Sequence, residues 1–465
     1  MSGQITTNAP VLQTLVQRLG APVDRRSLER AQLHVLDWLG CAVKGAHEAG
    51  AVGFLSDIND SLSAKCRRFS CHASSHVSSH VSCHVNSQRV GWWEALQINA
   101  ACGNIMEMDD LDRASILHPG PVIVPAAIAV AEHVGATGPQ LLHAIVRGYE
   151  ATIRIGRALG VKHYAFFHNT STCGAFGAAA AAADLLKLTA EQTVWALANA
   201  GSRTGGLWQM RHEACETKSL HNVQTAQCGV QAAMLAAQGV RGPASLLEGP
   251  QGLFAAMSPG ALASDVLAGI NRDWLIHEVS FKPWPACRHA HPIIDAALAL
   301  RLKIKDWQQI ESAVVSTYKS AIDFCDQPNP ENTAQAKFSL QHCAAVALIN
   351  GAPQFEHFDV VQLARADLVA LRKKIKVEES SALTEDFPQH YGAHLRLKMV
   401  DGTVFEHLQA DAKGDPELPL SHHEIEVKAN ILLQASGSHN NDQLIAATRK
   451  LYDAESVDAW TTLWP

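Results

Sequence analysis

The apolar residues of this chain follow a helical pattern first and an alternating pattern only later. From residue 10 to about 260, helix-favouring Ala and Leu dominate, and no alternating strand pattern is convincing. After about residue 265, partly alternating runs appear at 310–318, 374–378, 394–399 and 403–406. Asp401-Gly402 separates the last two, and Asp-Gly between alternating runs is the strongest short-range signal for a hairpin. The sequence therefore predicts a mainly α protein: a large all-helical domain with a smaller α+β domain.

Local signals set expected elements and boundaries. Thr189 followed by Gln192 is a capping box that opens a helix through Ala200, and Gly239 ends another helix that starts near Gln224. Further helices are expected at 92–106, 122–134, 290–302, 336–350 and within 420–460. We expect the C-terminal helices to rejoin the first domain. The predicted division is 1–266 with 401–465 for the helical domain and 267–400 for the α+β domain.

Composition excludes several classes of function. The 465 residues are 47% apolar and 18% charged with a net charge of −7, which suits a well-buried enzyme and favours neither nucleic acid nor an anionic membrane as a partner. Polar residues follow Met1, so no signal peptide is indicated, and the eleven cysteines are expected to be reduced thiols. We therefore expect a cytoplasmic protein.

One stretch places acidic residues beside a histidine at a break between two apolar helices. Glu107, Asp109, Asp110 and Asp112 precede His118, which is followed by Pro119-Gly120-Pro121. Carboxylates and an imidazole gathered at such a break suit proton transfer. A capping cluster for the second helix is the alternative.

Three other stretches carry candidate residues. His168 precedes a hydroxyl-rich turn that opens an Ala-rich helix, where a free helix N-terminus suits a substrate carboxylate, although simple N-capping explains the hydroxyls equally well. Lys218 lies three residues before His221. It could act as an acid or a base in a cleft, and an ordinary surface lysine is the alternative. The third stretch has cationic and imidazole side chains between prolines: Lys282, Arg288, His289 and His291. These side chains suit the binding of a carboxylate, and a rigid linker between domains is a second interpretation that is compatible with the first.

Missing motifs narrow the chemistry. The chain has no GxGxxG after a strand, no GxxxxGK[ST], no GxSxG and no HExxH, so nicotinamide, ATP, serine-hydrolase and zincin chemistry are not supported. Histidine recurs every fourth residue from 72 to 84; we interpret this segment as a solvated low-complexity loop, with adventitious metal binding as the alternative. The remaining His, Lys, Arg and carboxylates suit proton transfer at a carbon next to a carboxylate.

In this order, the four stretches resemble the MmgE/PrpD family, which contains 2-methylcitrate dehydratase, cis-aconitate decarboxylase and iminodisuccinate epimerase. The resemblance covers roughly residues 10–460, and its most specific parts are 107–121, 217–221, 282–296 and 336–340. It implies a helical domain built from both ends of the chain, a lid from about 267 to 400, an active site between them, a homodimer, and no required cofactor or metal.

The resemblance, together with one departure from it at His342, implies roles for nine residues. The expected catalytic residues are Lys218, His118, His168, Asp109 and His342, with Asp109 orienting an imidazole. The expected substrate-binding residues are Lys282, Arg288, His289 and Glu107.

Three departures from the family's pattern favour epimerisation. Decarboxylase and dehydratase relatives usually have Asp at position 107, Thr at 111 and often a tyrosine at 342, where this chain has Glu107, Leu111 and His342. The changes remove hydroxyl donors and add an imidazole, and epimerisation needs a proton donor and a proton acceptor on opposite faces of one carbon. The expected substrate is a small polycarboxylate such as iminodisuccinate. The alternatives are a 2-methylcitrate dehydratase-type hydro-lyase, a cis-aconitate decarboxylase and a non-catalytic homologue.

Overall fold

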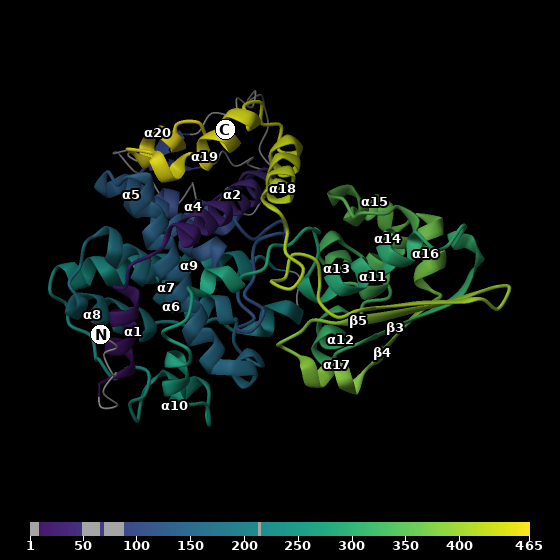
Figure 1. Ribbon diagram of the computed structural model, residues 1–465, viewed down its shortest axis with the longest axis horizontal. Helices are drawn as coiled ribbons and strands as arrows, with labels where there is room; N and C mark the ends of the chain where they lie inside the picture. Colours follow the sequence, from purple (N-terminus) through teal and green to yellow (C-terminus); the bar gives the residue numbers. More distant parts are fainter. Residues whose placement is uncertain (1–8, 49–65, 69–87, 213–214) are drawn as a thin grey trace. The chain divides into compact units, whose positions relative to one another are not determined.

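The computed structural model of the chain describes residues 9–48, 66–68, 88–212 and 215–465. The chain forms two compact units, Met1–Val279 with Ser421–Pro465, and Ser280–Leu420. In its described residues, the first unit is helical apart from one short strand pair. The second combines helices with a four-stranded sheet (Figure 1). The predicted fold class, mainly α with a smaller α+β domain, is confirmed. The histidine-rich segment at 71–84 lies outside the described residues.

The helical domain contains the following elements: α1 (Val11–Leu19), α2 (Arg25–Glu48), β1 (Cys66–Arg68), β2 (Gln88–Val90), α4 (Trp92–Cys102), α5 (Gly120–Val134), α6 (Gly138–Tyr164), α7 (Asn169–Leu185), α8 (Ala190–Gly201), α9 (Thr217–Ala237), α10 (Leu253–Met257), α18 (His422–Ala435), α19 (Asn441–Arg449) and α20 (Val457–Thr461). Short 3-10 helices lie at Trp208–His212, Ala263–Leu267, Leu275–Glu278 and Leu451–Asp453. Within the described part of the chain, no helix has the length and apolar character needed to cross a membrane.

Helix α7 is the centre of this domain. It packs against α5, α6, α8 and α9, and every residue from 169 to 183 is buried. Its Ala and Gly side chains are small, so neighbouring backbones approach closely: a Cβ on Gly177 would lie 2.7 Å from the carbonyl oxygen of Gly148 in α6. This close packing fixes the first turn of α7 relative to α9, which carries Lys218, and to α5, which begins directly after the segment that contains His118.

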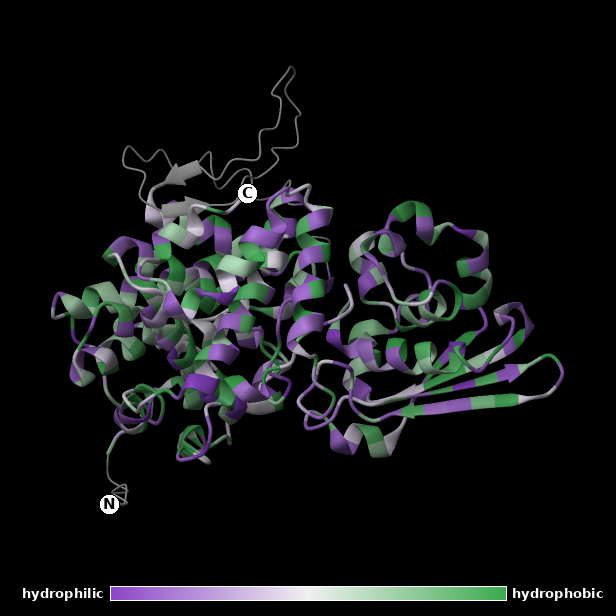
Figure 2. Ribbon diagram, turned by 45° about the horizontal axis from the view of Figure 1, so that its top comes forward, coloured by the Kyte–Doolittle hydropathy of each residue, from purple (hydrophilic) through white to green (hydrophobic). Residues whose placement is uncertain are grey.

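The α+β domain contains the following elements: α11 (His291–Arg301), β3 (Ile310–Thr317), α12 (Lys319–Cys325), α13 (Thr333–Lys337), α14 (Leu340–Ile349), α15 (Val360–Leu363), α16 (Ala366–Arg372), β4 (Ile375–Glu379), α17 (Ser381–Asp386), β5 (Ala393–Met399) and β6 (Val404–Gln409), with 3-10 helices at Arg288–Ala290, Trp307–Gln309 and Phe355–Phe358. The strand order is β4-β3-β5-β6, with β3 parallel to β4 and antiparallel to β5, and β5 antiparallel to β6. Apolar and polar residues alternate along the strands (Figure 2), and the buried side chains of β5 join the core formed with α11 and α14.

The hairpin between β5 and β6 is confirmed, with Gly402 at φ +87° in the turn that Asp401-Gly402 predicts. The predicted domain boundary at 400/401 falls inside this turn and would have separated the two strands, whereas the compact unit ends at Leu420. The expected helix at 336–350 is divided into α13 and α14. Ser339 is the reason, since its side chain accepts a hydrogen bond from His342 N and caps α14.

Candidate active site

The segment between α4 and α5 is anchored by the buried carboxylate of Asp110. Asp110 Oδ2 accepts hydrogen bonds from Tyr149 Oη (2.6 Å) and His34 Nδ1 (2.7 Å), and Oδ1 accepts one from Gly120 N (2.8 Å) at the start of α5. Burial raises the pKa of Asp110 to about 6, against the lowering effect of the bonds from Tyr149 and Gly120. The capping alternative therefore describes Asp110. It does not describe the neighbouring carboxylates, which pair with other groups.

The Nδ1 atom of His118 faces the backbone carbonyl of Asp110 and the carboxylate of Asp109. His118 Nδ1 lies 2.8 Å from Asp109 Oδ2 and 2.9 Å from the carbonyl oxygen of Asp110. A carbonyl oxygen can only accept a hydrogen bond, so Nδ1 carries a proton and, in the neutral imidazole, Nε2 carries the lone pair; none of the described residues hydrogen-bonds to Nε2. The His118 side chain is 15% exposed whereas Asp109 is 1% exposed. This geometry equips His118 to accept a proton from a small molecule.

Lys218 and Glu107 form a second pair. Lys218 is the second residue of α9, and its ammonium group forms an ion pair with the Glu107 carboxylate. Glu107 has φ +57°, a left-handed conformation that is costly for a residue with a side chain and is enriched at functional sites. Lys218 is 23% exposed, so this ammonium group is also accessible. The pair therefore holds a proton that Lys218 can donate.

His168 lies buried beside both pairs. It is the N-cap residue of α7, and its Nδ1 lies 3.2 Å from His221 Nδ1. Burial lowers the pKa of His168 well below its usual value, and the charges of Lys218, His221 and His118 lower it further. His168 is therefore neutral at physiological pH. The predicted residues Glu107, Asp109, His118, His168 and Lys218 thus lie together in the helical domain.

The predicted cationic residues of the α+β domain lie in a second group. Arg288 forms an ion pair with Asp415 and donates to the carbonyl oxygens of Ala412 and Lys413, so its charge is already matched within this domain. His289 Nδ1 lies 2.7 Å from Tyr318 Oη. Lys282, near them in sequence, is completely buried. These contacts make Arg288 a weaker candidate for binding a substrate carboxylate than its charge alone suggests.

The geometry argues against the predicted catalytic role of His342. Its Nε2 donates to the carbonyl oxygen of His357 (2.8 Å), and its Nδ1 accepts from Arg372 Nη1 (3.0 Å). Burial lowers its pKa to about 4. Both ring nitrogens are therefore used inside the α+β domain. The prediction rested on a histidine at a position where relatives often have a tyrosine. In the structure this imidazole hydrogen-bonds only to residues of its own domain, and the prediction is corrected for that reason.

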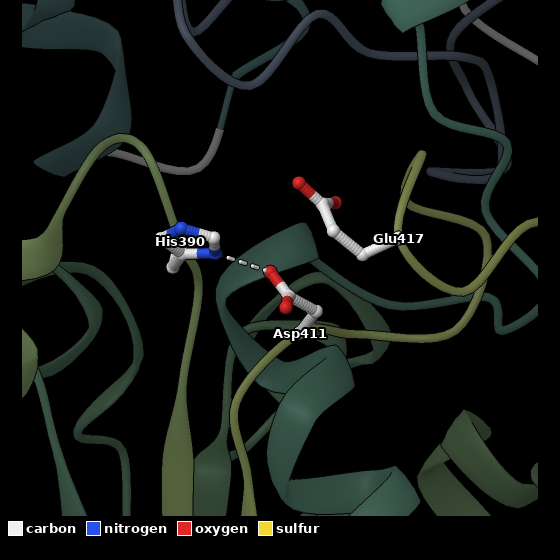
Figure 3. A group of neighbouring side chains, drawn as sticks. All are labelled: His390, Asp411 and Glu417. Carbon is white, nitrogen blue, oxygen red and sulfur yellow. Dashed lines mark hydrogen bonds and ion pairs between the residues drawn. The ribbon is translucent and has the colours of Figure 1, made fainter.

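One group among the described residues has the ligand types for a metal ion: His390, Asp411 and Glu417, whose ligand atoms lie within 4.8 Å of one another (Figure 3). His390 Nδ1 already donates to Asp411 Oδ1 at 2.7 Å, and the imidazole is 46% exposed. Such an exposed ion pair explains the geometry without a cation. We assign no metal-binding role to it.

Several residues that build the site were not identified from the sequence. His34 and Tyr149 bond to Asp110 from 76 and 39 residues away, and Lys428 donates to the carbonyl oxygen of Met108 from 320 residues away. No local pattern marks such distant partners. His221 lies three residues after Lys218, but no role could be assigned to it from the sequence alone.

Comparison with known proteins identifies the family of this chain. Residues 20–264 match the MmgE/PrpD N-terminal domain, and residues 284–453 match the MmgE/PrpD C-terminal domain. The chain belongs to the MmgE/PrpD family. The resemblance stated from the sequence is therefore confirmed at the level of the family.

Similar members of the family are decarboxylases by name. Cis-aconitate decarboxylase from Homo sapiens is 27% identical over 94% of this chain and 90% of its own length. The Mus musculus enzyme is also 27% identical, over 79% of this chain and 77% of its own. A cis-aconitate decarboxylase-like protein from Aspergillus oryzae is 24% identical over 86% of this chain and 85% of its own. This MmgE/PrpD protein is thus similar to enzymes along nearly its whole length.

Proposed function

We propose that this MmgE/PrpD protein is a cofactor-independent epimerase that inverts a carbon next to a carboxylate, with iminodisuccinate or a similar amino-polycarboxylate as its substrate. The observation that carries the proposal is the presence of two separate proton-carrying pairs, His118 with Asp109 and Lys218 with Glu107. One group that accepts a proton and one that donates a proton are the minimum equipment for inversion through an enediolate.

The two pairs have complementary roles in the proposed reaction. His118 Nε2 takes the proton from the α-carbon, and Asp109 stabilises the imidazolium that forms at Nδ1. Electron density moves into the adjacent carboxylate as the enediolate forms, and the ammonium group of Lys218 stabilises this charge. Lys218 then donates a proton to the opposite face of the carbon. His118 afterwards releases its extra proton to solvent and Lys218 takes up a proton from solvent, which restores both groups. Inversion in the reverse direction exchanges the roles of the two residues.

Decarboxylation of cis-aconitate is the second candidate, because three relatives bear that activity in their names. In that reaction CO₂ leaves and the resulting carbanion takes up a proton, so Lys218 or His118 acts only as an acid. Loss of water from 2-methylcitrate is a third possibility within the same family. The departures Glu107 and Leu111 favour the epimerase over both.

Incubation in D₂O separates the three reactions. The purified protein is given iminodisuccinate, cis-aconitate and 2-methylcitrate separately and is followed by NMR and chiral chromatography. The epimerase incorporates deuterium at the α-carbon of iminodisuccinate and removes its optical purity without releasing water or CO₂. Release of CO₂ from cis-aconitate, or of water from 2-methylcitrate, would contradict the proposal and assign the lyase reaction instead.

A further inference from the structure

Asn222 in α9 is a buried amide without a hydrogen-bond partner. Its side chain is 1% exposed, and neither Nδ2 nor Oδ1 is hydrogen-bonded to any described residue. Most buried polar groups in folded proteins are paired, because an unpaired donor or acceptor loses its bonds to water without replacement. An amide with both ends unpaired therefore points to a partner that binds there.

Asn222 lies on the face of α9 that meets the candidate active site. Residues 218, 222 and 225 are spaced by about one helical turn each, so they share one side of the helix. Lys218 on this side pairs with Glu107, and Thr225 Oγ1 donates to the carbonyl oxygen of Ser171 in the first turn of α7 (3.0 Å). Asn222 is placed between these two contacts.

A second unpaired polar atom lies at the start of α7, whose first turn contacts α9 through Ser171 and Thr225. His168 is 2% exposed, and its Nε2 has no hydrogen-bond partner among the described residues. Its other nitrogen faces His221 in α9, the helix that also carries Asn222. Depending on which imidazole carries the shared proton, His168 Nε2 is a donor or an acceptor, and Asn222 offers both kinds of atom.

We propose that the amide of Asn222 and Nε2 of His168 form a subsite for a hydrogen-bonding substituent that the substrate carries beside its carboxylates. Such a substituent is the hydroxyl of a hydroxy-polycarboxylate, which donates and accepts hydrogen bonds, or the protonated secondary amine of an imino-polycarboxylate, which donates to Asn222 Oδ1 and to the lone pair of His168 Nε2. The inference rests on the proposed function and deepens it, because it names the substituent that a substrate must carry beside its carboxylates. Sites that hydrogen-bond an OH or NH discriminate strongly against analogues without it.

Matched ligands test the subsite by isothermal titration calorimetry. Citrate and tricarballylate differ only by a hydroxyl, and iminodisuccinate and oxydisuccinate differ by a protonated secondary amine against an ether oxygen. The wild-type protein should prefer citrate or iminodisuccinate to its matched analogue by about tenfold or more, the preference identifying the group. Asn222→Leu should remove this preference. Gln224→Leu, an amide-to-leucine change at an exposed position of α9, should keep it.

The thermal midpoint separates the subsite from a purely structural amide. Because Asn222→Leu removes an unpaired buried amide, the variant should unfold at or above the wild-type temperature. Asn222→Ala provides a second variant that lacks the amide without adding bulk. Equal binding of both members of each pair by the wild type, or an unchanged preference in both Asn222 variants, would overturn the proposal. A preference without turnover of any substrate would instead contradict the proposed epimerase and leave the subsite standing.

Discussion

Accessibility distinguishes His118 and Lys218 from the residues that support them. Asp109 and His168 are almost fully buried, whereas the His118 and Lys218 side chains are partly exposed and carry the atoms that can exchange protons with a substrate. The sequence identified all four but could not rank them, since exposure depends on how α5, α7 and α9 pack. The same limit applies to His342. Its position in the sequence placed it among the expected catalytic residues, whereas its hydrogen bonds in the structure argue against that role.

Lys218→Met should abolish turnover while leaving the fold intact. The change removes the ammonium group that stabilises the enediolate and returns the proton, and loss of one acid–base group typically costs about 10²–10⁴-fold in kcat. Lys162→Met, at an exposed position of α6, is the matched control and should retain wild-type kcat. Circular dichroism checks the fold, and steady-state kinetics checks activity. Retained turnover in Lys218→Met would remove Lys218 from the mechanism.

At the scale of elements, the successful predictions rest on short-range signals. Thr189 caps α8 through Gln192 N as its spacing predicts, and the Asp401-Gly402 turn joins β5 to β6. The segment 103–119 behaves differently, because its shape depends on side chains from α2, α6 and α18. Its acidic residues are adjacent in sequence, but distant partners give each a different role.

Lys428 in α18 is expected to position the Glu107–Asp109 segment. Its ammonium group binds Asp37 in α2 and the carbonyl oxygen of Met108, the residue between the two carboxylates. Removing this bond frees the backbone that holds Glu107 in its left-handed conformation. We expect the double variant Asp37→Asn, Lys428→Met to lower kcat by about tenfold or more with a smaller change in KM, since misplaced catalytic groups slow the chemical step.

Removing both partners is necessary for a clear result. Lys428→Met alone would leave the Asp37 carboxylate buried without its cation, which costs about 3–5 kcal/mol of stability and confuses folding with function. The pair Lys44–Glu48, both residues of α2, offers a control in which Lys44→Met, Glu48→Gln removes an ion pair outside the Glu107–Asp109 segment. Wild-type kcat in the Asp37, Lys428 double variant would show that α18 has no influence on the catalytic residues.

At the scale of the whole molecule, both domains bury neutral histidines. The pKa values of His34 and His168 in the helical domain are lowered well below the usual value by burial, and that of His342 in the α+β domain is lowered to about 4. Each of these imidazoles is uncharged in the folded state and takes up a proton near pH 6.5 when the chain unfolds. Asp37 and Asp110, with pKa values raised by burial to about 6, oppose this effect below pH 6. The histidines therefore dominate between pH 7.5 and 6, and the free energy of unfolding should fall as the pH is lowered from 7.5 to 6.

His342 allows one contribution to be isolated. Between pH 6.5 and 4 the unfolded chain binds more protons at this residue than the folded chain does, so the free energy of unfolding falls as the pH falls through this window. The loss at pH 5 relative to pH 7.5 amounts to about 2 kcal/mol for this residue. In His342→Gln the amide can donate to His357 and accept from Arg372 without titrating, so the variant should lose about 2 kcal/mol less than the wild type over the same interval. Urea unfolding at both pH values measures the difference, and His423→Gln, at an exposed position, controls for the substitution itself. Parallel pH dependences in His342→Gln and the wild type would show that His342 is not held neutral in the folded protein.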